Sequence, residues 1–193
     1  MTFVYLHGFR SSPASAKATR FAAAVAALPQ ALRPKLSIPA LPDRPSQAMA
    51  IVESLVRQAT APVCLVGSSL GGFYATAAAE RFGVRAALIN PAVAPDVDLR
   101  DHGGIQVNLH TGARFEVTQA HFDDLRALRV DRITRPQRYL LLVQTGDEVL
   151  DYRQAVAFYA GAYQFVQGGG DHAFAGFEAQ IPTILAFVAR DGH

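Results

Sequence analysis

The segment that decides the fold reads VCLVGSSLGG and covers Val63–Gly72. Its first four residues are all apolar, which is typical of a short strand buried on both faces of a parallel sheet. Gly67–Gly71 follows, a G-x-S-x-G whose flanking glycines let neighbouring backbones pass without a side-chain clash. An Ala-rich helical pattern then covers Gly71–Phe82. Strand, sharp turn and helix in this order project Ser69 from the edge of the sheet.

Ser69 is therefore a candidate nucleophile, held at the start of a helix. The N–H groups of a first helical turn have no acceptor within the helix, and they suit a negative charge that develops on a nearby oxygen. Ser68 is the alternative in the same turn, as a polar residue that only fills it. The five-residue string alone is no more than suggestive, so its strand–turn–helix setting carries the prediction.

A second motif, His7-Gly8-Phe9, follows the apolar run Phe3–Leu6. In enzymes with a G-x-S-x-G turn, a loop of this kind donates a backbone N–H to the oxyanion that forms during attack on a carbonyl. We assign that donor to Phe9 and the second donor to Leu70. His7 is a possible base, but we expect it to orient the loop instead.

Two polar turns near the carboxyl end of the chain offer a base and a carboxylate. Asp147 follows the apolar run Tyr139–Gln144, and His172 follows the Gly-rich turn after Gln164–Gln167. Both lie at carboxyl ends of predicted parallel strands, where α/β sheets place their ligands. The order serine, aspartate, histidine is the one expected for this arrangement. A neutral imidazole takes the serine proton, and a buried carboxylate holds its tautomer and stabilises its charged form.

Three other carboxylates compete with Asp147 for this role, namely Glu148, Asp151 and Asp171. Asp147 stands nearest the strand end after a glycine, so we favour it. Asp171 adjoins His172, but neighbouring side chains there should point apart. The remaining histidines are less suited, since His102, His110 and His121 are expected to be solvated and His193 is the last residue.

Apolar β-type runs alternate with helical patterns, which predicts an α/β fold with a mostly parallel sheet of about six strands and helices on both faces. The predicted strands cover Phe3–Leu6, Lys35–Ile38, Val63–Val66, Arg85–Ile89, Tyr139–Gln144 and Gln164–Gln167. The predicted helices cover Ser12–Leu28 (with Ser12 as N-cap), Ser46–Ala59, Gly71–Phe82, Tyr152–Ala162 and Ala175–Ala189. Length and alternation together indicate one domain over residues 1–193.

One segment, residues 92–136, interrupts the alternation. It contains no convincing strand, a polar loop at Gly103–Gly104 and one helix around Val117–Arg126. Because an insert this long in a compact domain is often a lid or a binding loop, we expect it to be a lid or cap. Arginine recurs at every third residue from Arg126 to Arg138 among several aspartates, which indicates a solvated and partly self-paired face.

The composition excludes several classes of protein. Of the 193 residues, 50% are hydrophobic and 18% are charged, which is too apolar for a disordered chain. The net charge of +2 is too small for a nucleic-acid footprint. Cys64 is the single cysteine, so no disulfide can form within the chain. Phe21–Leu28 has the apolar face of a helix and no run is long enough to span a membrane, so we expect a cytoplasmic protein.

Longer segments of the chain are familiar, and they occur in the same order. They are YLHGFRSSPASAKA (Tyr5–Ala18), VGSSLGGFYAT (Val66–Thr76), NPAV (Asn90–Val93), QTGDEVLDYRQAVAFY (Gln144–Tyr159) and GGDHAFAGFE (Gly169–Glu178). On these segments the chain resembles the YqiA-like esterases of the α/β-hydrolase superfamily over nearly its whole length. The resemblance implies an α/β-hydrolase fold and hydrolysis of carboxylic esters or acyl thioesters through an acyl-serine intermediate. It supports Ser69, Asp147 and His172 by position. Because the hydrolase motifs begin at His7, we expect a trimmed sheet.

The expected partner is a small acyl ester or thioester, with acyl-CoA among the candidates. Arg10, beside the oxyanion loop, is a candidate contact for an anionic part of such a substrate. The sequence has no H-E-x-x-H and no phosphate-binding glycine loop, and we predict no metal and no cofactor. A serine-dependent C–C hydrolase or acyltransferase would use the same residues, and a non-catalytic binding protein could keep the scaffold. The sequence leaves the oligomeric state open.

Overall fold

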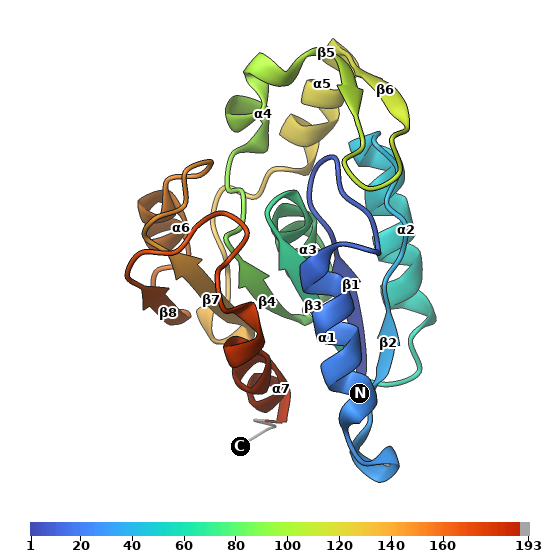
Figure 1. Ribbon diagram of the computed structural model, residues 1–193, viewed down its shortest axis with the longest axis vertical. Coiled ribbons are helices and arrows are strands. Elements are labelled where there is room, and N and C mark those ends of the chain that lie inside the picture. The colour runs from blue at the N-terminus through green and yellow to red at the C-terminus, as the bar shows by residue number, and fades with distance from the viewer. Residues whose placement is uncertain (190–193) are drawn as a thin grey trace.

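The computed structural model describes residues 1–189 and contains a six-stranded parallel sheet (Figure 1). The strands lie in the order β2-β1-β3-β4-β7-β8. They are β1 (Thr2–Leu6), β2 (Lys35–Ser37), β3 (Val63–Ser68), β4 (Arg85–Ile89), β7 (Tyr139–Gln144) and β8 (Tyr163–Gln167). Every neighbouring pair is parallel, so all the carboxyl ends meet at one edge. The predicted α/β architecture with about six strands is confirmed.

Helices cover both faces of this sheet, as the apolar side chains of its central strands require. In β3, Cys64 and Val66 pack in the cluster beneath α1 (Ala16–Ala27) and α7 (Ile181–Ala189). Leu65, between them, packs in the cluster of the opposite face. The helices of that face are α2 (Pro45–Gln58), α3 (Leu70–Phe82) and α6 (Tyr152–Phe158). Successive residues of β3 are all apolar because both faces are buried.

Two helices begin later than the sequence predicts. α1 begins at Ala16 and not at Ser12, because residues 12–15 form a separate turn closed by a backbone hydrogen bond to the Ser12 carbonyl. The last helix begins at Ile181 and not at Ala175, because Gly176 takes a left-handed conformation. Short 3-10 turns are η1 (Gln30–Leu32), η3 (Pro136–Arg138) and η4 (Phe177–Gln180). None of the helices in residues 1–189 has the length and apolar character needed to cross a bilayer.

The insert at residues 92–136 contains a hairpin that the sequence did not predict. Its antiparallel strands are β5 (Gly104–Val107) and β6 (Arg114–Val117). The expectation of no strand here was wrong, because Ile105 and Val107 are 64% and 39% exposed and so mark no buried face. Figure 1 shows the hairpin beyond the carboxyl ends of the sheet. The insert also contains α4 (Pro95–Asp98), η2 (Arg100–His102) and α5 (Gln119–Leu128), which confirms the predicted helix with shifted ends.

Helix α5 is held against α2 by buried and charged side chains. Asp124 pairs with Arg44, directly before α2, and the neighbouring Leu125 is buried. His121 is only 8% exposed, and its Nδ1 atom accepts the Thr118 N–H at 3.1 Å. The expectation that His121 is solvated was therefore wrong, because α5 packs against α2 and the Nε2 atom of His121 lies 3.4 Å from Oδ2 of Asp43, in the segment before α2.

The arginine-rich tract is partly paired, as expected. Arg126 pairs with Asp123 at 3.0 Å. Arg126 and Arg129 also lie 3.8 and 3.6 Å from the carboxylate of Asp96, whose side chain is 8% exposed. These ion pairs connect α4 with α5 and give the insert an internal structure. His193 lies outside the described residues.

Candidate active site

Close packing of glycines explains the sharp turn that carries Ser69. A Cβ atom on Gly67 would lie 2.4 Å from the carbonyl oxygen of Gly71, and one on Gly71 would lie 2.0 Å from that of Leu6. Both glycines of the motif are thus required where β1, β3 and α3 meet. Ser69 has a positive φ of 54°, a strained value for a residue with a side chain. The surrounding structure imposes this strain and places the hydroxyl at the carboxyl edge of the sheet.

Ser69, His172 and Asp147 form a hydrogen-bonded chain. The Oγ atom of Ser69 lies 3.1 Å from Nε2 of His172. On the other side of the ring, Nδ1 lies 2.9 Å from Oδ2 and 3.0 Å from Oδ1 of Asp147. The side chain of Asp147 is 2% exposed and that of His172 is 21% exposed. The structure thus brings together the three residues selected from the sequence, with the carboxylate buried behind the imidazole.

The loops that carry Asp147 and His172 meet because the pairing of β7 and β8 continues beyond the two strands. The N–H group of Gly146 donates across the sheet to the carbonyl of Gly169 at 2.9 Å. A Cβ atom on Gly146 would lie 2.4 Å from the carbonyl oxygen of Gly170. Only glycine permits this close approach. The approach of the two loops sets the distance between the side chains of Asp147 and His172.

The competing carboxylates have other partners. Glu148 accepts the backbone N–H of His172 through Oε2 at 3.0 Å. Asp151 precedes α6 and accepts a backbone N–H of its first turn. Asp171 is exposed. Among these carboxylates of the described chain, Asp147 is the one that reaches the imidazole.

Two buried amide side chains support the histidine loop, and the sequence analysis missed their role. Asn90, directly after β4, donates through Nδ2 to the carbonyls of Asp171 at 3.0 Å and His172 at 3.3 Å. Gln144, the last residue of β7, accepts the N–H of Asp171 at 3.0 Å and donates to the carbonyl of Ala175 at 2.8 Å. Asn90 is 3% exposed and Gln144 is fully buried. The sequence signal that could have revealed this role is an amide residue at, or directly after, the end of an otherwise apolar strand.

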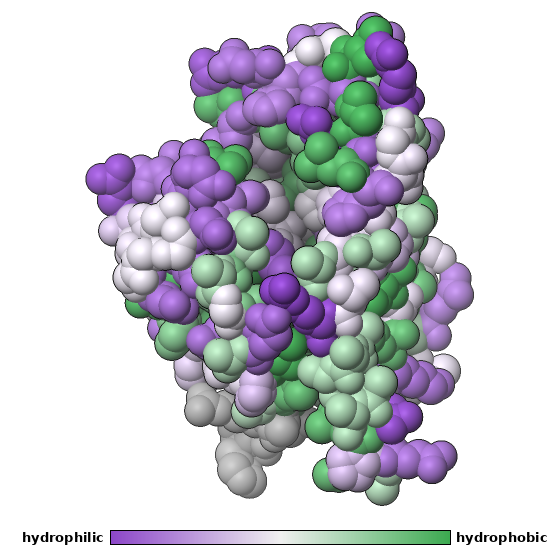
Figure 2. Space-filling view, in the orientation of Figure 1, coloured by the Kyte–Doolittle hydropathy of each residue, from purple (hydrophilic) through white to green (hydrophobic). Residues whose placement is uncertain are grey.

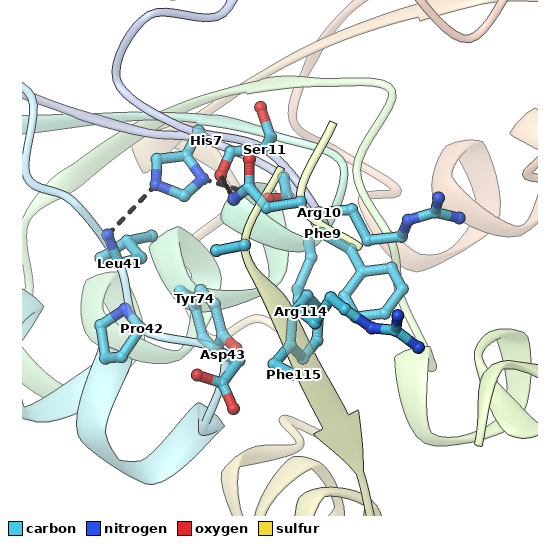
Figure 3. Close-up of a pocket in the computed structure, with 14 residues that line it drawn as sticks. His7, Phe9, Arg10, Ser11, Leu41, Pro42, Asp43, Tyr74, Arg114 and Phe115 are labelled. Atoms are coloured by element: carbon cyan, nitrogen blue, oxygen red, sulfur yellow. Dashed lines mark hydrogen bonds between the residues drawn. The ribbon is translucent and has the colours of Figure 1, made fainter. Parts of the chain in front are cut away.

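The His7-Gly8-Phe9 loop packs directly against the turn of Ser69. A Cβ atom on Gly8 would lie 3.1 Å from the Cβ of Ser69. The Nδ1 atom of His7 donates to the Gly8 carbonyl, and Nε2 accepts the N–H of Leu41, both at 3.1 Å (Figure 3). Burial lowers the pKa of His7, which keeps the ring neutral, as these bonds require. Since both ring nitrogens are engaged, His7 orients the loop and is not available as a base.

Two pockets flank this loop. The larger, of about 420 Å³, contains Ser69 and His172 in its lining and extends to the start of α1. The smaller, of about 220 Å³, lies between α3 and β6 and is lined in part by Phe9, Leu70 and Phe115 (Figure 3). Figure 2 shows a hollow on this face of the molecule, with apolar side chains gathered on the insert above it. The candidate nucleophile thus faces space that could hold a small molecule.

The hairpin of the insert is bound to the loop through three hydrogen bonds. Leu109 N–H donates to the carbonyl of Arg10 at 2.8 Å, and Asn108 Nδ2 donates to the carbonyl of Ser11 at 2.8 Å. In return, Nε of Arg10 donates to the carbonyl of Val107 at 2.9 Å. Arg10 lines the smaller pocket and not the pocket that contains the candidate nucleophile.

The electrostatics of the site favour the charged carboxylate form of Asp147. Burial alone would raise the pKa of Asp147, but hydrogen bonds from His172 and from the N–H groups of Leu150 and Val149 outweigh it and hold that pKa below its ordinary value. Burial also raises the pKa of Cys64 to about 12. The thiol therefore stays protonated inside β3 and is not a second nucleophile.

Residues 2–189 match the uncharacterised protein family UPF0227. The chain belongs to UPF0227, the YqiA family. The resemblance to YqiA-like proteins is thereby confirmed.

Solved structures with low sequence identity share the fold of this UPF0227 protein. α/β-Hydrolase domain-containing protein 10 from mouse has a TM-score of 0.73 at 18% identity, with 98% of this chain and 90% of that chain covered. The esterase domain of a Rhodothermus marinus protein has a TM-score of 0.71 at 18% identity, with 98% and 86% covered. A Paleococcus ferrophilus monoacylglycerol lipase has a TM-score of 0.67 at 15% identity, with 96% and 94% covered. The UPF0227 chain therefore has the α/β-hydrolase fold.

Proposed function

We propose that this protein hydrolyses carboxylic esters or acyl thioesters through an acyl-serine intermediate. The hydrogen-bonded chain from Ser69 through His172 to the buried Asp147 carries the proposal. Its order and spacing suit a nucleophile, a base and a group that orients the base. The hydrolase fold and the hydrolase neighbours support the same reaction class.

In this mechanism, His172 Nε2 takes the hydroxyl proton as Ser69 Oγ attacks the carbonyl carbon of the substrate. Asp147 keeps the proton on Nδ1 of the neutral ring and stabilises the imidazolium that forms. The N–H groups of Phe9 and Leu70 donate to the oxyanion. Leu70 is the first residue of α3, where a backbone N–H has no acceptor within the helix.

The second half of the reaction uses the same groups in reverse. His172 protonates the leaving alcohol or thiol, which then departs and leaves the acyl group on Ser69. His172 next removes a proton from a water molecule, whose oxygen attacks the acyl carbonyl. As the bond between the acyl carbon and Ser69 Oγ breaks, His172 returns the proton to Oγ, and the carboxylic acid is released. We also propose that Arg10, at the smaller pocket, contacts an anionic part of the leaving group, such as the phosphates of coenzyme A.

A pair of serine variants tests the proposal. Ser69→Ala should lower turnover of a p-nitrophenyl ester by at least ~10³-fold and abolish labelling by a fluorophosphonate probe. Ser68→Ala changes the neighbouring serine of the same turn and should retain labelling. If the folded wild-type protein is not labelled, the proposal fails, and a non-catalytic binding protein on a hydrolase scaffold is favoured. A series of esters and CoA thioesters of different chain length then gives the substrate preference.

A further inference from the structure

The larger pocket, which contains Ser69 and His172, is rich in hydrogen-bond donors. Its other polar side chains belong to Tyr5, His7, Ser11, Ser15, Lys17, Arg20, Ser68 and His110. Two of these side chains, Lys17 and Arg20, are basic, and no Asp or Glu of residues 1–189 is part of the lining. A lining of this composition is suited to an anionic group.

Lys17, in α1, brings a half-buried ammonium group to this pocket. Its Nζ atom donates to the carbonyl of Ala173 at 2.9 Å and to that of His172 at 3.4 Å. It forms no ion pair with a carboxylate of the described chain. Since an ammonium group has three N–H donors, one remains for a ligand. Burial lowers the pKa of Lys17, although the charges of Asp171 and Asp147 act in the opposite direction.

Tyr5, in β1, adds an independent observation. Its side chain is fully buried. Its hydroxyl lies near the side chain of Ser68 but has no partner in hydrogen-bond geometry among the described residues. Tyr5 also lines the larger pocket. Burial raises the pKa of this hydroxyl, so it keeps its proton and remains a donor. An unpaired buried hydroxyl destabilises a fold, and a ligand that accepted its hydrogen bond would offset this cost.

We propose that the larger pocket binds a carboxylate on the acyl part of the substrate, through the ammonium of Lys17 and the hydroxyl of Tyr5. The preferred substrates are then monoesters or monothioesters of dicarboxylic acids. One ammonium and one hydroxyl match the single charge and the two oxygens of a carboxylate better than the double charge of a phosphate. Arg20 contributes less, because Glu178 already pairs with it at 2.8 Å. The inference rests on the proposed acyl-serine function, since Ser69 must reach the ester carbonyl in the same pocket.

A matched pair of substrates tests the charge preference. Mono-p-nitrophenyl glutarate and p-nitrophenyl pentanoate have acyl chains of the same length, and only the first ends in a carboxylate. Each kcat/KM is divided by the rate of hydroxide hydrolysis of the same ester. We expect the wild-type protein to favour the glutarate ester by about tenfold, which is the effect of one good charge-assisted hydrogen bond.

Three variants assign that preference to the pocket. Lys17→Met should abolish most of it, and Tyr5→Phe should lower it several-fold. Any effect of Lys17→Met on the histidine loop lowers both esters alike and cancels in the ratio. Lys35 is the other lysine of the chain and is exposed in β2, so Lys35→Met is the control and should leave the ratio unchanged. The inference is overturned if both esters are hydrolysed and the ratio of their normalised kcat/KM values is the same in wild type, Lys17→Met and Tyr5→Phe.

A binding measurement separates failure of the pocket from failure of the reaction. In Ser69→Ala protein labelled with ¹³Cε-lysine, the two lysines give two signals, which Lys17→Met assigns. Added glutarate should shift the signal of Lys17 and leave that of Lys35 in place. If neither ester is hydrolysed but this shift occurs, the acyl-serine reaction is refuted and the carboxylate site stands. If the esters are hydrolysed but saturating glutarate does not shift the Lys17 signal, the carboxylate site is refuted and the acyl-serine reaction stands.

Discussion

Asn108 connects the insert to the segment after His7-Gly8-Phe9 by donating through Nδ2 to the carbonyl of Ser11 at 2.8 Å. The Oδ1 atom of the same amide accepts the N–H groups of His110 and Thr111 at 2.9 and 3.0 Å. One side chain therefore shapes the turn of the hairpin and also binds that turn to the segment after Phe9. If the loop supplies an oxyanion donor, its position depends on the insert.

Replacing Asn108 by aspartate keeps the acceptor for the hairpin turn and removes the donor to Ser11. We expect Asn108→Asp to lower kcat for neutral esters about tenfold, which corresponds to about 1.4 kcal/mol in the barrier, with little change in Tm. Asn108→Ala loses both functions and should also lower Tm. A wild-type kcat in Asn108→Asp would show that the insert does not position the loop.

Asp147→Asn should lower kcat by about 10⁴-fold, because the amide no longer stabilises the imidazolium and favours the wrong tautomer of His172. Asp171→Asn is the matched control, since this neighbouring carboxylate is exposed and does not contact the imidazole. Its kcat should stay close to that of the wild type. Equal losses of kcat in both variants would show that Asp147 is not the carboxylate that acts on His172.

Acid should reduce the stability of the wild-type protein more than that of Asp147→Asn. The folded state holds the pKa of Asp147 below its ordinary value, so it binds this proton less readily than the unfolded chain does. The resulting stabilisation is complete above the ordinary aspartate pKa of about 4 and is lost as pH falls through the lower folded value. Urea unfolding at pH 7 and at several values below 4 should show the difference between the two proteins shrinking. A difference independent of pH would contradict this account.

Gly71→Ala should destabilise the protein, although alanine favours helices. The added Cβ would lie 2.0 Å from the carbonyl oxygen of Leu6, and only movement of the backbone can relieve that contact. We expect a loss of about 3 kcal/mol in the free energy of unfolding. Gly103→Ala is the control, because nothing lies within 4 Å of its Cβ and its φ of −62° suits alanine. Thermal denaturation of both variants tests this prediction. Similar Tm values would show that the contact between residue 71 and the Leu6 carbonyl does not require glycine.

Charge reversal at Arg10 tests the contact proposed at the smaller pocket. Figure 3 shows the guanidinium groups of Arg10 and Arg114 extending to the same side. Arg10→Glu should raise KM for CoA thioesters more than for neutral esters, by about tenfold, because it replaces attraction of the phosphates with repulsion. Equal changes in KM for the two substrate types would remove Arg10 from substrate binding.

Sequence patterns predicted the elements next to the active site because local physics determines them. A strand buried on both faces needs an uninterrupted apolar run, and such runs precede both Gly67 and Thr145. The close spacing of Ser69, Asp147 and His172 then follows from the parallel sheet, whose carboxyl ends meet at one edge. Position after a strand end, together with the G-x-S-x-G turn and the order serine, aspartate, histidine, therefore selected these three residues.

Contacts between distant segments could not be predicted in this way. His121 contacts Asp43, in the segment before α2, and the role of Asn90 depends on a loop that comes much later in the chain. The hairpin was missed because Ile105 and Val107 face outward, which removes the link between apolar side chains and a buried face. Each of these features arises from tertiary packing rather than from a local pattern.

Strands β4 and β7 are neighbours in the sheet, although the insert separates them in the chain. Ser69 and the loop of Phe9 are therefore synthesised well before Asp147 and His172. During translation, the growing polypeptide exposes the open edge of β4 until β7 has left the ribosome. An unfinished chain has the proposed nucleophile without its base, so we expect it to have no hydrolytic activity until the segment after β8 has been synthesised and has folded against β7.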